Sequence, residues 1–119
     1  MMLHVEIHQD TLTVRFAPWA RLFTRTGTVS VPLTEIAEVR LIDRPLKVAK
    51  GTYRGLLVSG VVKIGTWTSP SGVKRLTAAR RDVGGLQIIL KSPMAGHDEL
   101  VLSVPDAEPL RRRLLAVPA

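Results

Sequence analysis

The sequence contains no cysteine and few aromatic residues, and acidic side chains are the minority among its charges. The lack of cysteine excludes disulfides, cysteine-based zinc sites, iron–sulfur clusters and cysteine nucleophiles, and it fits a reducing compartment. No apolar run approaches the roughly 20 residues that are needed to cross a bilayer. The first residues also lack a charged segment followed by an apolar one, so we expect no signal peptide. These absences predict a cytoplasmic protein without a transmembrane segment.

The length and the charge of the chain favour one basic domain. Its 119 residues fit a single compact domain over 1–119, and 17 Lys+Arg against 10 Asp+Glu give a formal charge of +7. A basic surface attracts phosphate-bearing partners. The alternative is that the charges only keep the surface solvated. Arginine outnumbers lysine twelve to five, and together with the many Ala, Val and Leu residues this ratio is typical of a GC-rich bacterial gene, so the basic charge need not reflect anion binding. The net charge alone therefore does not identify a binding partner.

Alternation of apolar and polar residues predicts strands along most of the chain. The first two alternating runs are separated by Gln9-Asp10 and predict an antiparallel hairpin. A tight turn is expected over 33–36. The segments expected to be strands are 3–8, 11–16, 28–31, 37–42, 61–67, 73–79, 86–90 and 100–104.

Two segments have the period of a helix. The stretch 18–25 begins with a proline and places Trp19, Leu22 and Phe23 on one face, which we expect to lie in the core. The stretch 106–117 begins at a capping aspartate, ends before Pro118 and carries an apolar stripe. Because an isolated helix of about a dozen residues is marginal in water, we expect the C-terminal helix to dock. The residues expected to face the rest of the protein are Ala107, Leu110, Leu114, Leu115 and Val117.

The segment 43–59 follows neither period and contains a proline and two glycines, so it is predicted to be a long connection. It holds the densest group of cations outside the last helix. The candidate contacts for an anion or a partner are Arg44, Lys47, Lys50 and Arg54, with Lys63 adjacent on the following strand. On one hypothesis Leu46, Leu56 and Leu57 would add an apolar insertion into a lipid surface. On the alternative, these leucines and Val48 cover the core while the cations solvate the loop.

Several strings of the sequence resemble bacterial pleckstrin-homology-like (PH-like) domains, a family of largely unknown function. They are RFAPWARLFTRTGTVSVPLTEIAEVRLID, KGTYRG, IGTW, LQIIL and ELVLSVPDAEPLRRRLLA, which together span nearly the whole chain. The resemblance implies a mainly β fold: an antiparallel barrel of about seven or eight strands, with a short helix after the first hairpin and an amphipathic helix at the C-terminus. The first hairpin departs from the phosphoinositide-binding members, because its connection is short and acidic instead of rich in Lys and Arg.

Motifs for catalysis, metal or cofactor binding are lacking. His4, Glu6 and His8 share one strand face, but the two histidines lie about 13 Å apart on a strand and cannot hold one ion. The segment 97–99, His-Asp-Glu, is expected to be a solvated hairpin tip, and no serine lies in a nucleophile motif. The glycines match no phosphate-binding loop. We predict no catalytic residue, no metal site, no cofactor and no enzymatic activity.

The function expected from the sequence is a noncatalytic binding or scaffolding module. A protein partner is favoured. The alternative is an electrostatic binder of an anionic membrane surface or of nucleic acid through the basic 44–54 segment, with the protein then peripheral at the inner face of the membrane. Nucleic acid is disfavoured, because only Tyr53 and Trp67 would remain outside the core to stack on bases. The oligomeric state and the identity of any partner stay open.

Overall fold

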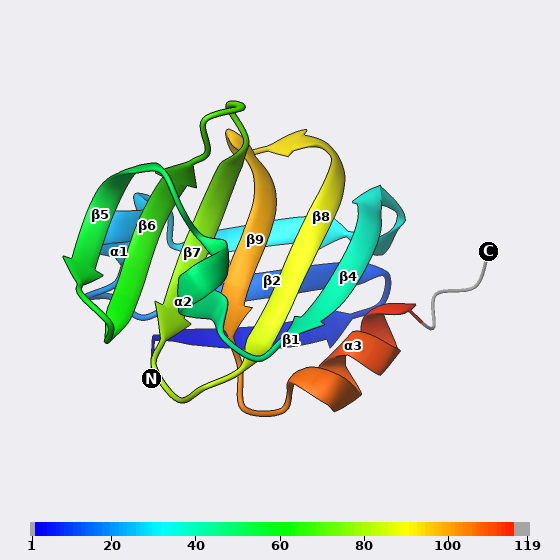
Figure 1. Cartoon of the computed structure of the whole chain (residues 1–119). Coiled ribbons are helices and arrows are strands. Elements are labelled where there is room, and N and C mark those ends of the chain that lie inside the picture. Colours follow the sequence, from blue (N-terminus) through cyan, green and yellow to red (C-terminus); the bar gives the residue numbers. More distant parts are fainter. Residues whose placement is uncertain (1, 116–119) are drawn as a thin grey trace.

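The computed structural model describes residues 2–115, and in this part of the chain nine strands form two sheets. Figure 1 shows the strands of the smaller sheet running across those of the larger one. The strands are β1 (Leu3–His8), β2 (Thr11–Phe16), β3 (Thr28–Pro32), β4 (Ile36–Ile42), β5 (Thr52–Val58), β6 (Val62–Thr68), β7 (Lys74–Arg80), β8 (Gly85–Met94) and β9 (His97–Ser103).

The smaller sheet has the order β1-β2-β3 and contains the predicted first hairpin. Leu3 pairs with Phe16 and His8 with Thr11, so the alternation of the two runs sets the register. The inward positions Leu12, Val14 and Phe16 are buried. The next segment also follows the prediction, with β3 leading into the single 3-10 turn η1 (Leu33–Glu35).

The larger sheet has the order β4-β8-β9-β7-β6-β5, and it differs from an antiparallel barrel in two ways. First, β7 and β9 are parallel, because β9 returns through its hairpin with β8 and is inserted between β7 and β8. Second, the strand pairing within residues 2–115 forms two separate sheets and does not close into one barrel. The supported description is therefore a mainly β fold of two layers with a C-terminal helix.

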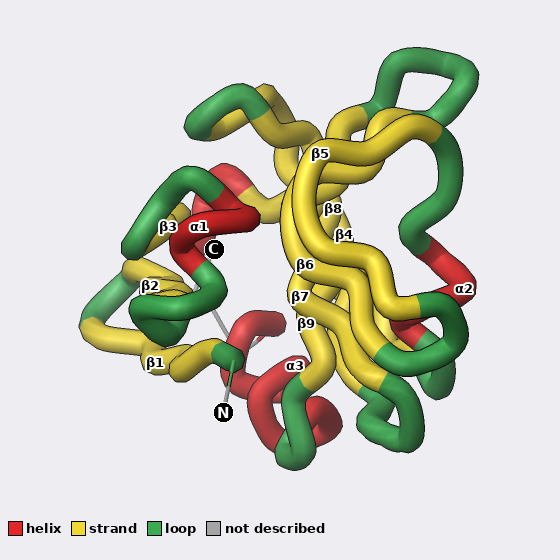
Figure 2. The backbone as a smooth tube through the Cα atoms, turned by 90° about the vertical axis from the view of Figure 1, so that its left-hand side faces the viewer, coloured by secondary structure: helices red, strands yellow, loops and turns green. Residues whose placement is uncertain are grey.

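Three short helices flank the sheets: α1 (Arg21–Thr24), α2 (Pro45–Val48) and α3 (Ala107–Leu115). Figure 2 shows α1 and α3 on the side of the smaller sheet, whereas α2 lies on the opposite side of the larger sheet. The predicted apolar stripe of α3 is confirmed at Ala107, Leu110 and Leu114, but Leu115 is exposed. Val117 and Pro118 lie outside the described residues. None of the helices in residues 2–115 has the length and apolar character of a membrane span.

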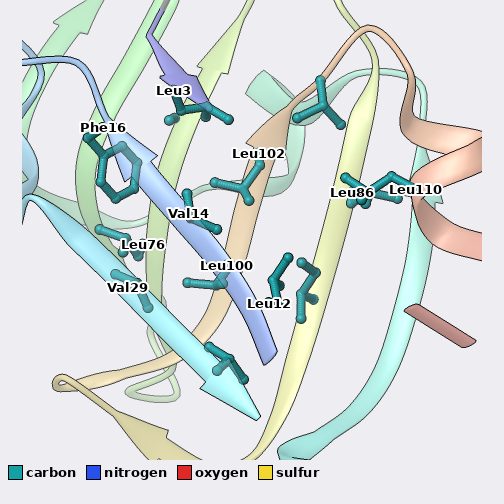
Figure 3. Packing of buried hydrophobic residues seen from close by; sticks show 14 of the residues in the cluster. Leu3, Leu12, Val14, Phe16, Val29, Leu76, Leu86, Leu100, Leu102 and Leu110 are labelled. Carbon is teal, nitrogen blue, oxygen red and sulfur yellow. The ribbon is translucent and has the colours of Figure 1, made fainter. Parts of the chain in front are cut away.

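The core lies between the two sheets and is built from one face of each (Figure 3). The larger sheet contributes the inward positions of β4 and of β6 to β9, and the smaller sheet contributes those of β1 to β3. Leu110 and Leu114 of α3 join the same cluster. Burial of this much apolar surface provides the main free energy of folding.

The prediction of a long connection over 43–59 is wrong, because this segment folds as α2 followed by strand β5. One of its two glycines is part of the sheet: Gly55 lies opposite Gly65 in the register of β5 and β6, and both have positive φ. A Cβ at either position would overlap a backbone carbonyl of the paired strand. Gly55 therefore permits close strand pairing, whereas the sequence pattern placed it in the connection.

The prediction for 18–25 is also corrected. Only Arg21–Thr24 is helical, so the apolar face expected for a longer helix does not form. Phe23 packs against the core, but Trp19 is 46% exposed and Leu22 is 78% exposed. With one helical turn, only part of the apolar set can face inward, and Ala20 and Thr24 occupy the buried positions instead.

Candidate functional site: a basic groove beside α2

A groove of about 720 Å³ lies between α2, the β5–β6 turn and the β7–β8 loop. In Figure 1 α2 lies in front of β7, and the β5–β6 turn and the β7–β8 loop lie below it at the lower left, although the three segments are far apart in the sequence. The wall on the side of α2 contains Arg44, Leu46 and Lys47. The groove therefore exists only because β5 and β6 bring residues 57–63 to the same end of the sheet as the loop after β7.

Cations dominate the groove. Its lining contains five of them, against the two carboxylates of Asp43 and Asp82. Asp82 is partly neutralised, since one of its oxygens lies 3.6 Å from Nε of Arg81 in an exposed ion pair. The cations that line the groove are Arg44, Lys47, Lys63, Arg80 and Arg81. An uneven balance of charge in a concave site raises the local concentration of anions.

Lys63 holds α2 against the sheet. Its Nζ donates to the carbonyl of Leu46 at 2.8 Å and also to the carbonyl of Ala49. The same Nζ lies 5.6 Å from the centre of the Trp67 ring, a cation–π distance. Burial lowers the pKa of Lys63, and the charge of Lys50 lowers it further. Lys63 is therefore a positioning residue, which leaves Arg44 and Lys47 as the exposed cations on the α2 side.

The four predicted contact residues do not form one cluster. Arg44 and Lys47 line the groove, and Lys50 lies close enough to Lys63 to lower its pKa. Arg54 lies elsewhere, because the alternation of β5 places it on the face opposite to Tyr53 and Leu57. It lines a separate hollow of about 490 Å³ with Lys74 and His97.

Arg80 and Arg81 complete the groove and were not singled out by the sequence analysis. They are adjacent in the sequence and lie directly before a turn, and this pair of arginines was the one sequence feature that could have indicated their role. Nothing in the sequence places this pair next to residues 44–47, which are more than thirty positions away. The contact depends on α2 packing across β7, β8 and β9.

The segment 97–99 is not the solvated hairpin tip that the sequence suggested. His97 and Glu99 are buried on β9, and only Asp98 is partly exposed. His97 Nε2 lies 2.7 Å from the hydroxyl of Thr66 in a hydrogen bond. Burial lowers the pKa of His97, so the neutral imidazole is favoured in the folded protein.

Glu99 accepts two hydrogen bonds on one carboxylate oxygen. Arg75 Nε donates at 3.0 Å and Gln87 Nε2 at 2.6 Å. Together the three residues form a polar cluster on the outer face of the larger sheet. Their side chains are mutually satisfied, so this cluster has a structural role.

Tyr53 and Trp67 stack on each other, with ring centroids 5.0 Å apart and an angle of 12° between the planes. Trp67 is 2% exposed, so its ring is covered and is not a platform for a base. Glu6, which was weighed as a metal ligand, instead lies 2.8 Å from the guanidinium of Arg15 on the neighbouring strand.

No protein-family model, curated protein or solved structure matches this chain.

Proposed function

We propose that this protein is a noncatalytic binding module that takes an anionic partner in the basic groove beside α2. The observation that supports the proposal is the charge of the groove: five cations and two carboxylates line it, so cations remain in excess although Asp82 pairs with Arg81. Each Lys or Arg near an anionic surface contributes about 1 kcal/mol of attraction. Four of the five cations belong to exposed residues and can approach phosphate or carboxylate groups directly.

The groove offers mainly charged side chains for binding. No histidine is among the described residues that line it, and its one hydroxyl side chain is Ser59 on the exposed β5–β6 turn. This composition supports recognition of charge by a module that needs no cofactor.

We further propose that the module is a PH-like domain of a bacterial protein. Support comes from the short helix after the first hairpin, the crossed strands of the two sheets and the amphipathic α3. The β1–β2 connection, Gln9-Asp10, carries no cation, so the proposed site lies at the other sheet. Both an acidic protein surface and an anionic membrane at the inner face would present suitable groups.

The test uses inorganic tripolyphosphate as the probe, titrated by calorimetry at 50 mM and 150 mM salt. We expect the double variant Arg44→Gln/Lys47→Gln to bind on the order of 30-fold more weakly than wild type, since two contacts of about 1 kcal/mol each are lost. Binding by wild type should also weaken with salt, because charge interactions are screened.

The matched control is Lys91→Gln/Arg112→Gln, which removes the same net charge from exposed residues outside the groove. Its affinity should stay within about twofold of wild type, because distant exposed charges are screened. Equal weakening in both double variants would show that net charge alone attracts the probe, and the proposal would then be wrong.

A further inference from the structure

Four exposed apolar side chains lie in or near the end of the sheet that carries the basic groove. Leu57 lines the groove itself, Val58 and Val61 flank the β5–β6 turn, and Trp19 lies beyond that turn. Their exposed fractions are 38%, 44%, 40% and 46% in the same order. We call these four residues the apolar rim. A large aromatic and three aliphatic side chains in one exposed area mark an interaction surface.

The rim and the groove form one continuous surface. Trp19 and Val61 line a hollow of about 490 Å³ whose other lining includes Arg80 and Arg81. The same two arginines also line the basic groove. Arg80 and Arg81 therefore lie between Trp19 and Val61 on one side and Arg44 and Lys47 on the other.

The combination of exposed apolar side chains and cations fits the surface of a lipid bilayer better than it fits a purely polar partner. Tryptophan is enriched at the level of the headgroups, where its ring is in an apolar layer and its N–H can meet water. Peripheral proteins combine an apolar face with Lys and Arg that approach anionic headgroups. A nucleic acid would meet the cations but would leave Leu57, Val58 and Val61 in water.

We propose that this end of the molecule docks on an anionic lipid membrane. The apolar rim enters the headgroup region, and Arg44, Lys47, Arg80 and Arg81 contact the lipid phosphates. The inference rests on the proposed function, because it names the source of the anionic groups that the groove binds. It adds the rim, which electrostatic binding alone does not require.

Tryptophan fluorescence provides a direct readout, because the two tryptophans differ in exposure. Trp67 is 2% exposed and stacked on Tyr53, so a lipid-dependent change must come from Trp19. On addition of vesicles of phosphatidylcholine with 30% phosphatidylserine, we expect the emission to shift to shorter wavelength. The variant Trp19→Phe should lose this shift and keep most of its binding in a sedimentation assay.

The rim is tested with Val58→Ser/Val61→Ser, which changes two exposed residues and leaves every charge in place. We expect its affinity for the same vesicles to fall at least tenfold, while its affinity for tripolyphosphate stays within twofold of wild type. Arg44→Gln/Lys47→Gln should lose affinity for both probes. Vesicles of phosphatidylcholine alone should bind wild type at least tenfold more weakly than the anionic vesicles.

The outcomes separate the two proposals. Binding of tripolyphosphate without sedimentation on anionic vesicles overturns the membrane inference and leaves the proposed function standing. If Val58→Ser/Val61→Ser sediments with the vesicles as well as wild type does, and the emission of Trp19 does not shift, the proposed role of the apolar rim is wrong. If a short DNA duplex binds as tightly as the vesicles do, the lipid assignment is wrong. If wild type binds none of these probes, both proposals fail.

Discussion

The two faces of the larger sheet differ in what they bury. On the inner face β9 presents Leu100 and Leu102 to the core, whereas on the outer face the same strand presents Glu99 and Ser103. The outer residues are also buried, with Glu99 held by two donors and Ser103 accepting from the Arg80 amide, and buried apolar Val101 lies between them on the strand. The inner face thus gains stability from apolar packing alone, whereas the outer face combines apolar contacts with satisfied polar groups beneath α2.

The largest effect is expected from the inner face. Leu100→Ala removes a side chain that is 1% exposed between the two sheets, and it should lower the free energy of unfolding by about 2 to 5 kcal/mol. Urea denaturation measures this loss. The folded fraction of the variant should still bind tripolyphosphate within about twofold of wild type, since the groove lies on the opposite face. A loss below about 0.5 kcal/mol would place Leu100 outside the core.

The inner face was predictable because its signal is local. Alternation of apolar and polar residues sets which side chains of β1, β2 and β9 face inward, and this pattern is independent of which strands become neighbours. The expected hairpin over 3–16 followed from it, and the docked α3 followed from the equally local helical period of 106–117. The number of sheets and the parallel β7–β9 pair did not, because pairing order is a property of the whole chain.

The outer face and the groove were predictable only in part. Arg44 and Lys47 were singled out by local charge density, and both line the groove. Arg54 was grouped with them because it is close in sequence, but strand alternation turns it to the other face. Arg80 and Arg81 were missed because their nearness to α2 depends on tertiary packing. Because the cluster of cations is assembled from three separate segments, no single basic run in the sequence indicates it.

A smaller effect is expected when the polar cluster on the outer face is broken. Glu99→Ala would leave the Arg75 and Gln87 donors without their acceptor, and it should lower the free energy of unfolding by about 1 to 3 kcal/mol. Glu99→Gln is the control, because it keeps an oxygen for Gln87 and should lose less. Chemical denaturation of the three proteins at pH 7 provides the comparison. Equal stability of Glu99→Ala and wild type would mean that water replaces the carboxylate without cost.

The smallest effect concerns His97, which shares β9 with both of these residues. Its pKa is lowered from 6.5, first by burial, and the Lys74 charge also lowers it, whereas the Ala95 backbone and Asp98 act in the opposite direction. Because the pKa is lower in the folded protein, the unfolded chain binds more protons between the folded pKa and 6.5. Stability from this group is therefore complete above pH 6.5 and decreases as the pH falls towards the folded pKa.

The measurement is the free energy of unfolding in urea at pH 7.5, 6.5, 5.5 and 5.0. Carboxylates also titrate at the acid end of this range, so the quantity to compare is the slope in wild type against His97→Gln and His8→Gln. His97→Gln should have the shallower slope, because the buried imidazole that resists protonation is gone. His8 is exposed on β1, and His8→Gln is the control for replacing a histidine at the surface. If His97→Gln retained the full slope of wild type, burial of this imidazole would contribute nothing to acid sensitivity, and the acid sensitivity would belong to the carboxylates.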